Sequence, residues 1–198
     1  MLKFAKTLTA LSIIGALTGC AVGTGTVLKA DSVTLSPDES VVVLGVKSPG
    51  FRVMLFPVSV ENERFTVSPF DSAVVNGSPT HGYVVAKVKA GQMLGLTRIV
   101  APDADALLGG IFSPCGDNRG LIFEAPRAGR VVYLTDVEYA RNGSRLEIRY
   151  SSEWDRAQSH MKQHFSSLAA PLEKHEFHLM NGARSCESAL TIPVYITR

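Results

Sequence analysis

The feature that most constrains the fold of this chain is a pair of alternating segments joined by an Asn-Gly sequence. Residues 130–140 read RVVYLTDVEYA and residues 145–150 read RLEIRY, and apolar and polar residues alternate along most of both. Such alternation is typical of strands with one buried face. Asn142-Gly143 fits the two central positions of a tight turn, which require positive φ. The sequence therefore predicts an antiparallel hairpin, and in its first strand we expect a buried face formed by Val131, Tyr133, Val137 and Tyr139.

Further runs of β-branched and apolar residues recur at short intervals along the chain. They occupy residues 41–46, 51–60, 83–88, 93–100, 121–124, 176–180 and 189–196. Gly, Pro and Asn residues lie between most of these runs and indicate turns. Many short strands with turn signals between them are typical of two packed antiparallel sheets.

One segment has a helical period instead. Ser152 offers an N-cap, and Asp155 places an acid in the first turn. An apolar stripe then follows, formed by Trp154, Ala157, Met161, Phe165 and Leu168. Trp154 is interpreted as a core residue of this stripe, with an interface anchor as the alternative. We therefore expect a mainly β fold, an antiparallel β-sandwich with one α-helix near residues 153–168 in the C-terminal region.

The first nineteen residues have the pattern of an export signal. Lys3 and Lys6 give a basic start without acids, and residues 7–17 (TLTALSIIGAL) are apolar or small. A membrane-spanning helix needs roughly 20 apolar residues, about twice the length of this run. Residues 1–19 are therefore predicted to be a signal peptide that is removed.

The end of this signal, Leu17-Thr18-Gly19-Cys20, resembles the lipobox of bacterial lipoproteins. The resemblance implies cleavage before Cys20, a thioether between the Cys20 thiol and diacylglycerol, and acylation of the new N-terminus. Several acyl chains on one residue make a stable membrane anchor. The alternative is that Cys20 merely follows a signal cut elsewhere. Ala21, in place of aspartate, favours the periplasmic face of the outer membrane over the inner membrane, by analogy with enterobacterial sorting.

After the predicted anchor, the composition divides the chain into a tether and one domain. Residues 20–32 contain small residues and two glycines, as in a flexible linker, and residues 33–198 have the length of a single domain. Loss of Lys3 and Lys6 with the signal leaves 18 basic residues beside 18 acidic ones. This balance does not predict the basic face that nucleic acid binding needs, so we expect no nucleic acid partner.

The cysteines gain meaning from the predicted export. With Cys20 bound to lipid, the remaining cysteines are Cys115 and Cys186. An even pair in an oxidising compartment usually forms a disulfide. We therefore predict a Cys115–Cys186 disulfide, with two separate buried thiols as the alternative.

A second resemblance concerns the body of the chain. Residues 83–91 (YVVAKVKAG) with 94–98 (LGLTR), and residues 123–134 (FEAPRAGRVVYL), resemble a pattern of small bacterial envelope proteins. That pattern occurs in sandwich domains of the transthyretin-like or carboxypeptidase-regulatory kind. Such domains are generally non-catalytic, so the resemblance implies binding or assembly. It supplies no functional residue.

The residues with the clearest chemical potential are histidines. His160 and His164 are four apart on the predicted helix and therefore share a face on which both could bind one metal ion. His175 or His178 is a candidate third ligand. Lys162 lies between the pair, and no glutamate of a metalloprotease motif accompanies them. We therefore interpret the pair as half-exposed surface histidines, with a metal-binding or hydrolytic domain as the alternative.

Residues 101–120 form a long connection in the predicted fold. Asp103, Asp105 and Asp117 lack the spacing of a calcium site, so we interpret this stretch as a solvated acidic loop. Residues 107–112 (LLGGIF) are interpreted as a short core strand, with an exposed partner contact as the alternative.

Together these features predict a lipid-anchored envelope lipoprotein that faces the periplasm. We expect it to act as a non-enzymatic binding or assembly module for an envelope protein or a cell-wall component, with no cofactor and no metal. The rival hypothesis is the metal-binding or hydrolytic domain that uses His160 and His164.

Overall fold

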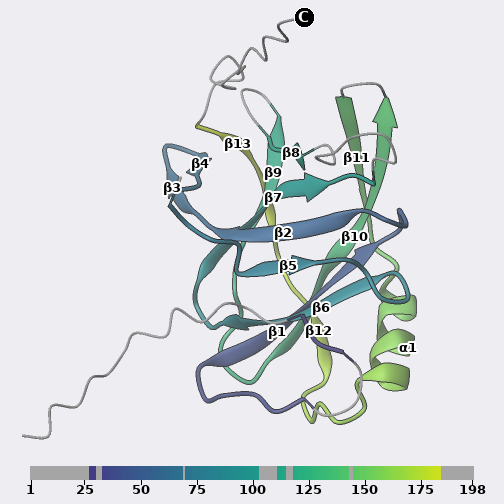
Figure 1. The fold of residues 1–198 in the computed structure, drawn as a ribbon. Helices are drawn as coiled ribbons and strands as arrows, with labels where there is room; N and C mark the ends of the chain where they lie inside the picture. The colour runs from purple at the N-terminus through teal and green to yellow at the C-terminus, as the bar shows by residue number, and fades with distance from the viewer. Residues whose placement is uncertain are drawn as a thin grey trace, which may run out of the picture.

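Two β-sheets and one helix make up the described part of the chain in this computed structural model, namely residues 27–29, 33–68, 70–102, 111–114, 118–142 and 145–183 (Figure 1). The helix is α1 (Trp154–His164). The strands are β1 (Glu39–Val46), β2 (Arg52–Pro57), β3 (Ser59–Glu61), β4 (Arg64–Thr66), β5 (Val75–Gly77), β6 (Tyr83–Lys89), β7 (Met93–Val100), β8 (Ile111–Phe112), β9 (Arg119–Glu124), β10 (Val131–Asn142), β11 (Arg145–Ser151), β12 (Leu172–Lys174) and β13 (His178–Gly182). The predicted mainly β fold with one helix is confirmed, and it is consistent with a β-sandwich.

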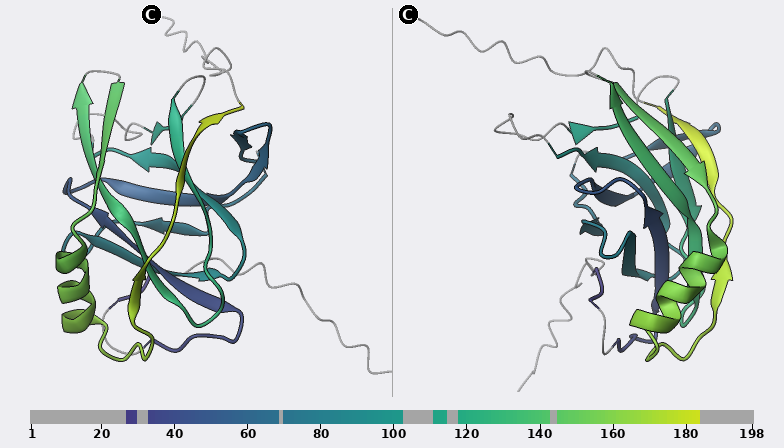
Figure 2. Two further views of the ribbon diagram at one scale, coloured as in Figure 1. Left: turned by 180° about the vertical axis from the view of Figure 1, so that it is seen from behind. Right: turned by 90° about the vertical axis from the view of Figure 1, so that its right-hand side faces the viewer.

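The two sheets have different strand orders. The first runs β11-β10-β1-β6, with β12 also paired to β10, and the second runs β3-β4-β13-β9-β7-β2-β5, with β8 paired to β7. Most pairs are antiparallel, as expected, but β1–β10, β10–β12 and β4–β13 are parallel. The views in Figures 1 and 2 place α1 at one end of β10 and the β10–β11 hairpin at the other.

A break in the register of β10 overturns the face that alternation predicts for this strand. β1 pairs Val43 with Tyr133, but its Gly45 pairs with Asp136, so β10 has one extra residue. Such a bulge reverses the side-chain alternation beyond it. Val131 and Tyr133 therefore pack beneath α1, whereas Val137 and Tyr139 belong to the core between the sheets. Asp136 is buried, although alternation places it on the polar face.

The predicted hairpin is present with a shifted turn. β10 and β11 pair in antiparallel register, and Asn142 faces Arg145. Asn142 therefore belongs to the ladder, and residues 143–144 lie outside the described residues. Another hairpin, which the sequence reasoning missed, joins β3 to β4 through a two-residue turn. Its turn residues Asn62 and Glu63 have φ of 50° and 61°, the left-handed values that such a turn requires.

The helix is shorter than predicted and has a different start. It ends at His164 rather than near residue 168, and its N-cap is Glu153, without a side-chain capping bond, rather than Ser152. The predicted apolar stripe is confirmed, because all five of its residues pack in one cluster against the first sheet. Tertiary contacts to β10, described below, replace the local cap.

Residues 27–29 already contact the folded domain, although the sequence predicted a free tether over residues 20–32. Val27 forms an antiparallel bridge with Ala86, and the Leu28 amide donates to the Val85 carbonyl at 2.8 Å. The side chain of Val27 fills the space beside Gly77, where a Cβ would lie 2.6 Å from Val27 Cγ2. Residues 27–29 therefore lie along β6 and reach the edge of β5.

The remaining strands differ from the expected ones in number and in position. β4, β5 and β12 are too short to show a pattern and were not predicted, and the strand predicted at residues 176–180 lies at His178–Gly182. The strand predicted at residues 189–196 lies outside the described residues. Within the described ranges, no helix has the length and apolar character needed to cross a membrane.

Candidate functional site

The predicted lipid and disulfide cysteines, Cys20, Cys115 and Cys186, lie outside the described residues. The structure nevertheless brings chain neighbours of the disulfide pair together. The carbonyl oxygen of Pro114 lies 3.3 Å from the position that a Cβ on Gly182 would occupy. Four further residues, at ~3.5 Å each, can span ~14 Å. This reach is compatible with the pairing, which stays a prediction.

The two helical histidines lie in a larger group than the sequence indicated. The imidazoles of His81, His160 and His164 meet where α1 faces the turn before β6. The ring centroids of His160 and His164 are 4.8 Å apart, and those of His81 and His164 are 4.7 Å apart. We call these three residues the histidine cluster. Sequence reasoning missed His81, because it lies about 80 residues before the others and only tertiary packing joins them.

The geometry of the histidine cluster does not favour the metal hypothesis. The rings of His81 and His164 are stacked with an interplanar angle of 9°. A metal ion lies in the plane of each imidazole that binds it, so two stacked rings cannot both direct a nitrogen at one ion. Neither candidate third ligand belongs to this cluster. His175 contacts the Glu124 carbonyl through Nε2 at 2.7 Å, and His178 lies on β13, paired with Ile122 of β9. Among the described residues, no three His, Cys, Asp or Glu side chains are placed to hold a metal ion.

His160 is buried rather than half-exposed, which corrects its interpretation as a surface histidine. Only 8% of its surface is accessible, and its ring stacks on Tyr83 with centroids 4.4 Å apart. Burial lowers the pKa of His160 to about 4, and the nearby His164, His81 and Arg156 act in the same direction. The ring is therefore held neutral at pH 7.

Beside the histidine cluster, a buried carboxylate holds the start of α1. Asp136 Oδ2 accepts the Glu153 amide at 2.7 Å and the Tyr133 hydroxyl. Its other oxygen occupies the space beside Gly45, where a Cβ would lie 1.7 Å from Oδ1. Gly45 is thus the residue on β1 that leaves room for the carboxylate. Burial and the bond to Asp136 raise the pKa of Tyr133 well above its usual range.

Charged residues surround this carboxylate toward solvent. Glu153 pairs with Lys47 at 2.5 Å and with Arg156 at 3.0 Å, and these hydrogen bonds lower the pKa of Glu153.

Tyr83 is buried, and its hydroxyl has no hydrogen-bond partner among the described residues. Burial and then the charge of Asp136 raise the pKa of Tyr83 to about 12. The phenol is therefore neutral and unsuited to act as a base at pH 7.

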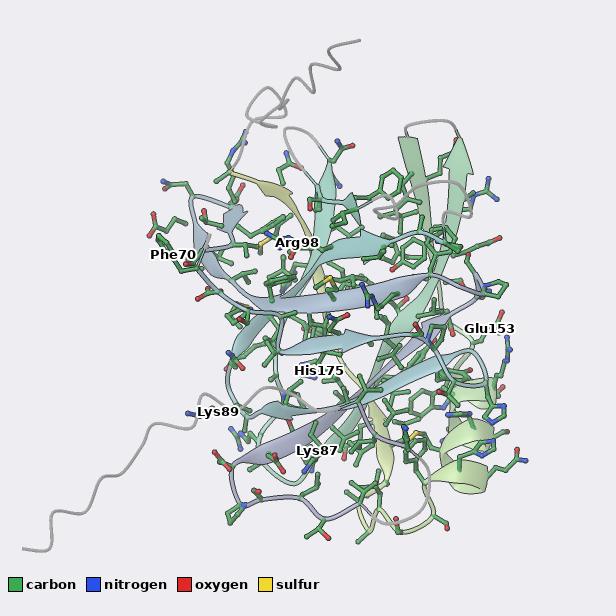
Figure 3. The ribbon with its side chains drawn as sticks, in the orientation of Figure 1. Phe70, Lys87, Lys89, Arg98, Glu153 and His175 are labelled. Carbon is green, nitrogen blue, oxygen red and sulfur yellow. The ribbon has the colours of Figure 1, made fainter. Side chains whose placement is uncertain are left out.

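A shallow depression of about 510 Å³ opens at the first turn of α1. It is lined by Ser152, Glu153, Trp154, Asp155, Arg156 and Lys174. Trp154 is half-buried, with its ring edge-on to Tyr133 at 5.8 Å and the Lys174 ammonium 5.4 Å from its centroid. Trp154 packs against the cluster beneath α1, as predicted, but it lies at the edge of that cluster rather than in its buried centre. Figure 3 shows Glu153 at the same end of the helix.

Large apolar side chains are exposed at the far end of the second sheet. Phe70 is 93% exposed, and Val60 on the edge strand β3 is 37% exposed. Figure 3 shows Phe70 at the outer side of the body, away from α1. In the predicted 107–112 strand, only Ile111 and Phe112 are described; they form β8, where Ile111 is 66% exposed. The acidic residues Asp103, Asp105 and Asp117 lie outside the described ranges.

No protein-family model, no curated protein and no solved structure matches this chain.

Proposed function

We propose that this protein is a lipid-anchored envelope lipoprotein that binds an envelope protein and holds it near the membrane surface. Cys20 would supply the anchor, and the β-rich body would supply the contact. The proposal keeps the outer membrane, at its periplasmic face, as the favoured location, from Ala21 in the sequence. The resemblance to non-catalytic envelope domains that the sequence suggests for residues 83–91 with 94–98 and for residues 123–134 agrees with a role in binding or assembly.

The docking of Val27 and Leu28 on β6 supports the tethering half of this proposal. Cys20 precedes Val27 by seven residues. At ~3.5 Å per residue, these span at most ~25 Å. A body joined to its anchor by so short a segment stays close to the bilayer. This geometry suits a protein that keeps a partner near the membrane.

The proposal that this protein binds a partner rests on the exposure of Phe70. A phenylalanine buries a large apolar area when it is covered, and large aromatic side chains are enriched at protein interfaces. Phe70 follows the hairpin of β3 and β4, and all three residues of β3 are exposed at the edge of the second sheet. An apolar side chain beside an open strand edge fits a protein surface better than a glycan, so we favour a protein partner over a cell-wall component.

Site-specific photocrosslinking in the native cells tests this proposal. Phe70 is replaced by p-benzoylphenylalanine, and the matched control carries the same group at the exposed Lys89, distant from Phe70 in Figure 3. We expect one discrete protein adduct from position 70 and none of that mass from position 89. The adduct should weaken when Cys20→Ser removes the anchor. Identical adducts at both positions, or none at position 70, would contradict the proposed contact.

A further inference from the structure

The histidine cluster lies at the contact that keeps α1 on the first sheet. His160 and His164 come from the helix, and His81 comes from the turn that leads into β6. Residues of the helix cover an apolar surface on this sheet, formed by Val41, Val43, Val85 and Val131 together with Tyr83 and Tyr133. Ala157, Met161 and Phe165 pack onto it from the helix and are themselves buried. Any charge that develops in the cluster therefore acts across this contact.

We propose that the histidine cluster is an acid-sensitive latch, in which protonation of His160 drives α1 away from the sheet and exposes the apolar surface beneath it. This inference is independent of the proposed function. It rests on the closeness of the three rings, on the burial of His160 and on the sign of the charges around them.

The charges that act on His160 all oppose its protonation. The helix α1 contributes two of these residues, His164 and Arg156, and the turn before β6 contributes the third, His81. β6 contributes Tyr83, a neutral ring that stacks on His160 and lies 6.0 Å from the Arg156 guanidinium carbon. β10 contributes Asp136, whose charge acts on Arg156 and Tyr83. Among the described residues, no carboxylate is a source of the shift at His160.

The direction of the pH effect follows from proton linkage. In the docked helix the pKa of His160 is lowered to about 4 from the ordinary 6.5, mainly by burial. An undocked helix exposes the ring to water and restores the ordinary value. Between pH 6.5 and pH 4 the undocked form therefore binds more protons, and undocking becomes more favourable as pH falls. The contribution of His160 to docking is fully present above pH 6.5. Over this window the undocking constant should rise by about two orders of magnitude.

The chain contains its own reporter of this motion. Trp154 is the only tryptophan of the sequence and is the first residue of α1. Its ring leaves Tyr133 when the helix undocks, so its emission should shift to longer wavelength. Amide hydrogen exchange, corrected for the intrinsic rate at each pH, gives an independent readout for α1 and for the strands β2 and β7. Both are measured on the full mature protein in detergent, with EDTA present to remove adventitious metal.

In the wild-type protein, we expect a reversible change of Trp154 emission and a loss of α1 protection with a midpoint between pH 6.5 and pH 4, while β2 and β7 stay protected. His160→Phe keeps an aromatic ring on Tyr83 but cannot be charged. It should move the midpoint to lower pH by at least about one unit, or abolish the transition. If this variant does not fold, the double variant of His81→Gln and His164→Gln, at less buried positions, should produce a smaller shift in the same direction.

His178→Gln on β13 is the matched control, because it removes an exposed histidine outside the cluster. It should leave the midpoint unchanged. The proposal is overturned if α1 and the strands lose protection together at one pH, or if the cluster variants keep the wild-type midpoint.

Discussion

The two buried clusters of this protein lie on opposite faces of the same strands and are specified in different ways. The cluster between the sheets has Tyr139 as its one member with a polar side chain, and it borders one buried serine, Ser48, whose hydroxyl bonds to the Tyr139 backbone. The cluster beneath α1 is smaller and borders the buried polar residues Asp136 and His160. β1, β6 and β10 supply side chains to both clusters.

Burial therefore has a different consequence in each cluster. Between the sheets, apolar area removed from water stabilises the fold without fixing a particular contact. Beneath α1, the position of the helix depends on the Asp136 carboxylate and on the neutral His160. We therefore expect substitutions between the sheets to affect the whole molecule, and substitutions beneath α1 to affect the helix first.

The largest effect should come from Phe123→Ala, in the cluster between the sheets. Phe123 is 1% exposed, and truncation of such a side chain leaves a cavity that costs about 3–5 kcal/mol of unfolding free energy. In urea denaturation, Trp154 fluorescence and far-ultraviolet circular dichroism should shift together. Phe70→Ala is the matched control, since the exposed ring should change stability by less than about 0.5 kcal/mol. Separate shifts of the two probes would show that the clusters unfold independently.

Gly45→Ala should have the next largest effect, because the new Cβ occupies the place of the Asp136 carboxylate. Displacing that carboxylate breaks its bonds to Glu153 and Tyr133, and we expect a loss of about 2–4 kcal/mol. The decisive measurement is a double-mutant cycle. In the Asp136→Ala background, the same change at Gly45 should cost less than about 1 kcal/mol. An equal cost in both backgrounds would mean that the backbone, and not the carboxylate, requires glycine.

Asp136→Ala alone should destabilise the protein by about 1–3 kcal/mol, because it leaves the buried Tyr133 hydroxyl without its carboxylate acceptor and removes one of the two acceptors of the Glu153 amide. Hydrogen exchange should show the loss mainly in α1, with β2 and β7 little affected. Glu138→Ala, two residues along β10 at an exposed position, is the control and should be nearly neutral. Uniform loss of protection would remove the distinction between the two clusters.

The smallest effect should come from Val27→Ser, at the seam between β5 and β6. Val27 is half-buried, so we expect a loss of about 1 kcal/mol. Limited proteolysis should cut near residue 27 faster than in the wild-type protein. Lys29→Ser changes an exposed side chain and should leave the cleavage rate unaltered. An unchanged rate for Val27→Ser would mean that the backbone pairing alone holds this segment.

Several elements were predictable from the sequence because local patterns specify them. Alternation and β-branched runs located β1, β6, β7 and β10, and an apolar stripe located α1. These patterns report which residues seek burial within one element. They do not report the partner of that element, so the parallel pairing of β1 with β10 was not foreseen.

The sequence by itself determined the mainly β class, the hairpin of β10 and β11 and the apolar face of the single described helix. Only the tertiary structure decided that Asp136 is buried, that Gly45 leaves room for it and that His81 joins His160 and His164. The physical reason is the range of the interactions. Strand and helix periods arise from neighbouring residues, whereas one bulge in β10 and one turn before β6 bring together groups that are distant along the chain. The chemistry of the candidate site is therefore a property of the packing, not of any local sequence pattern.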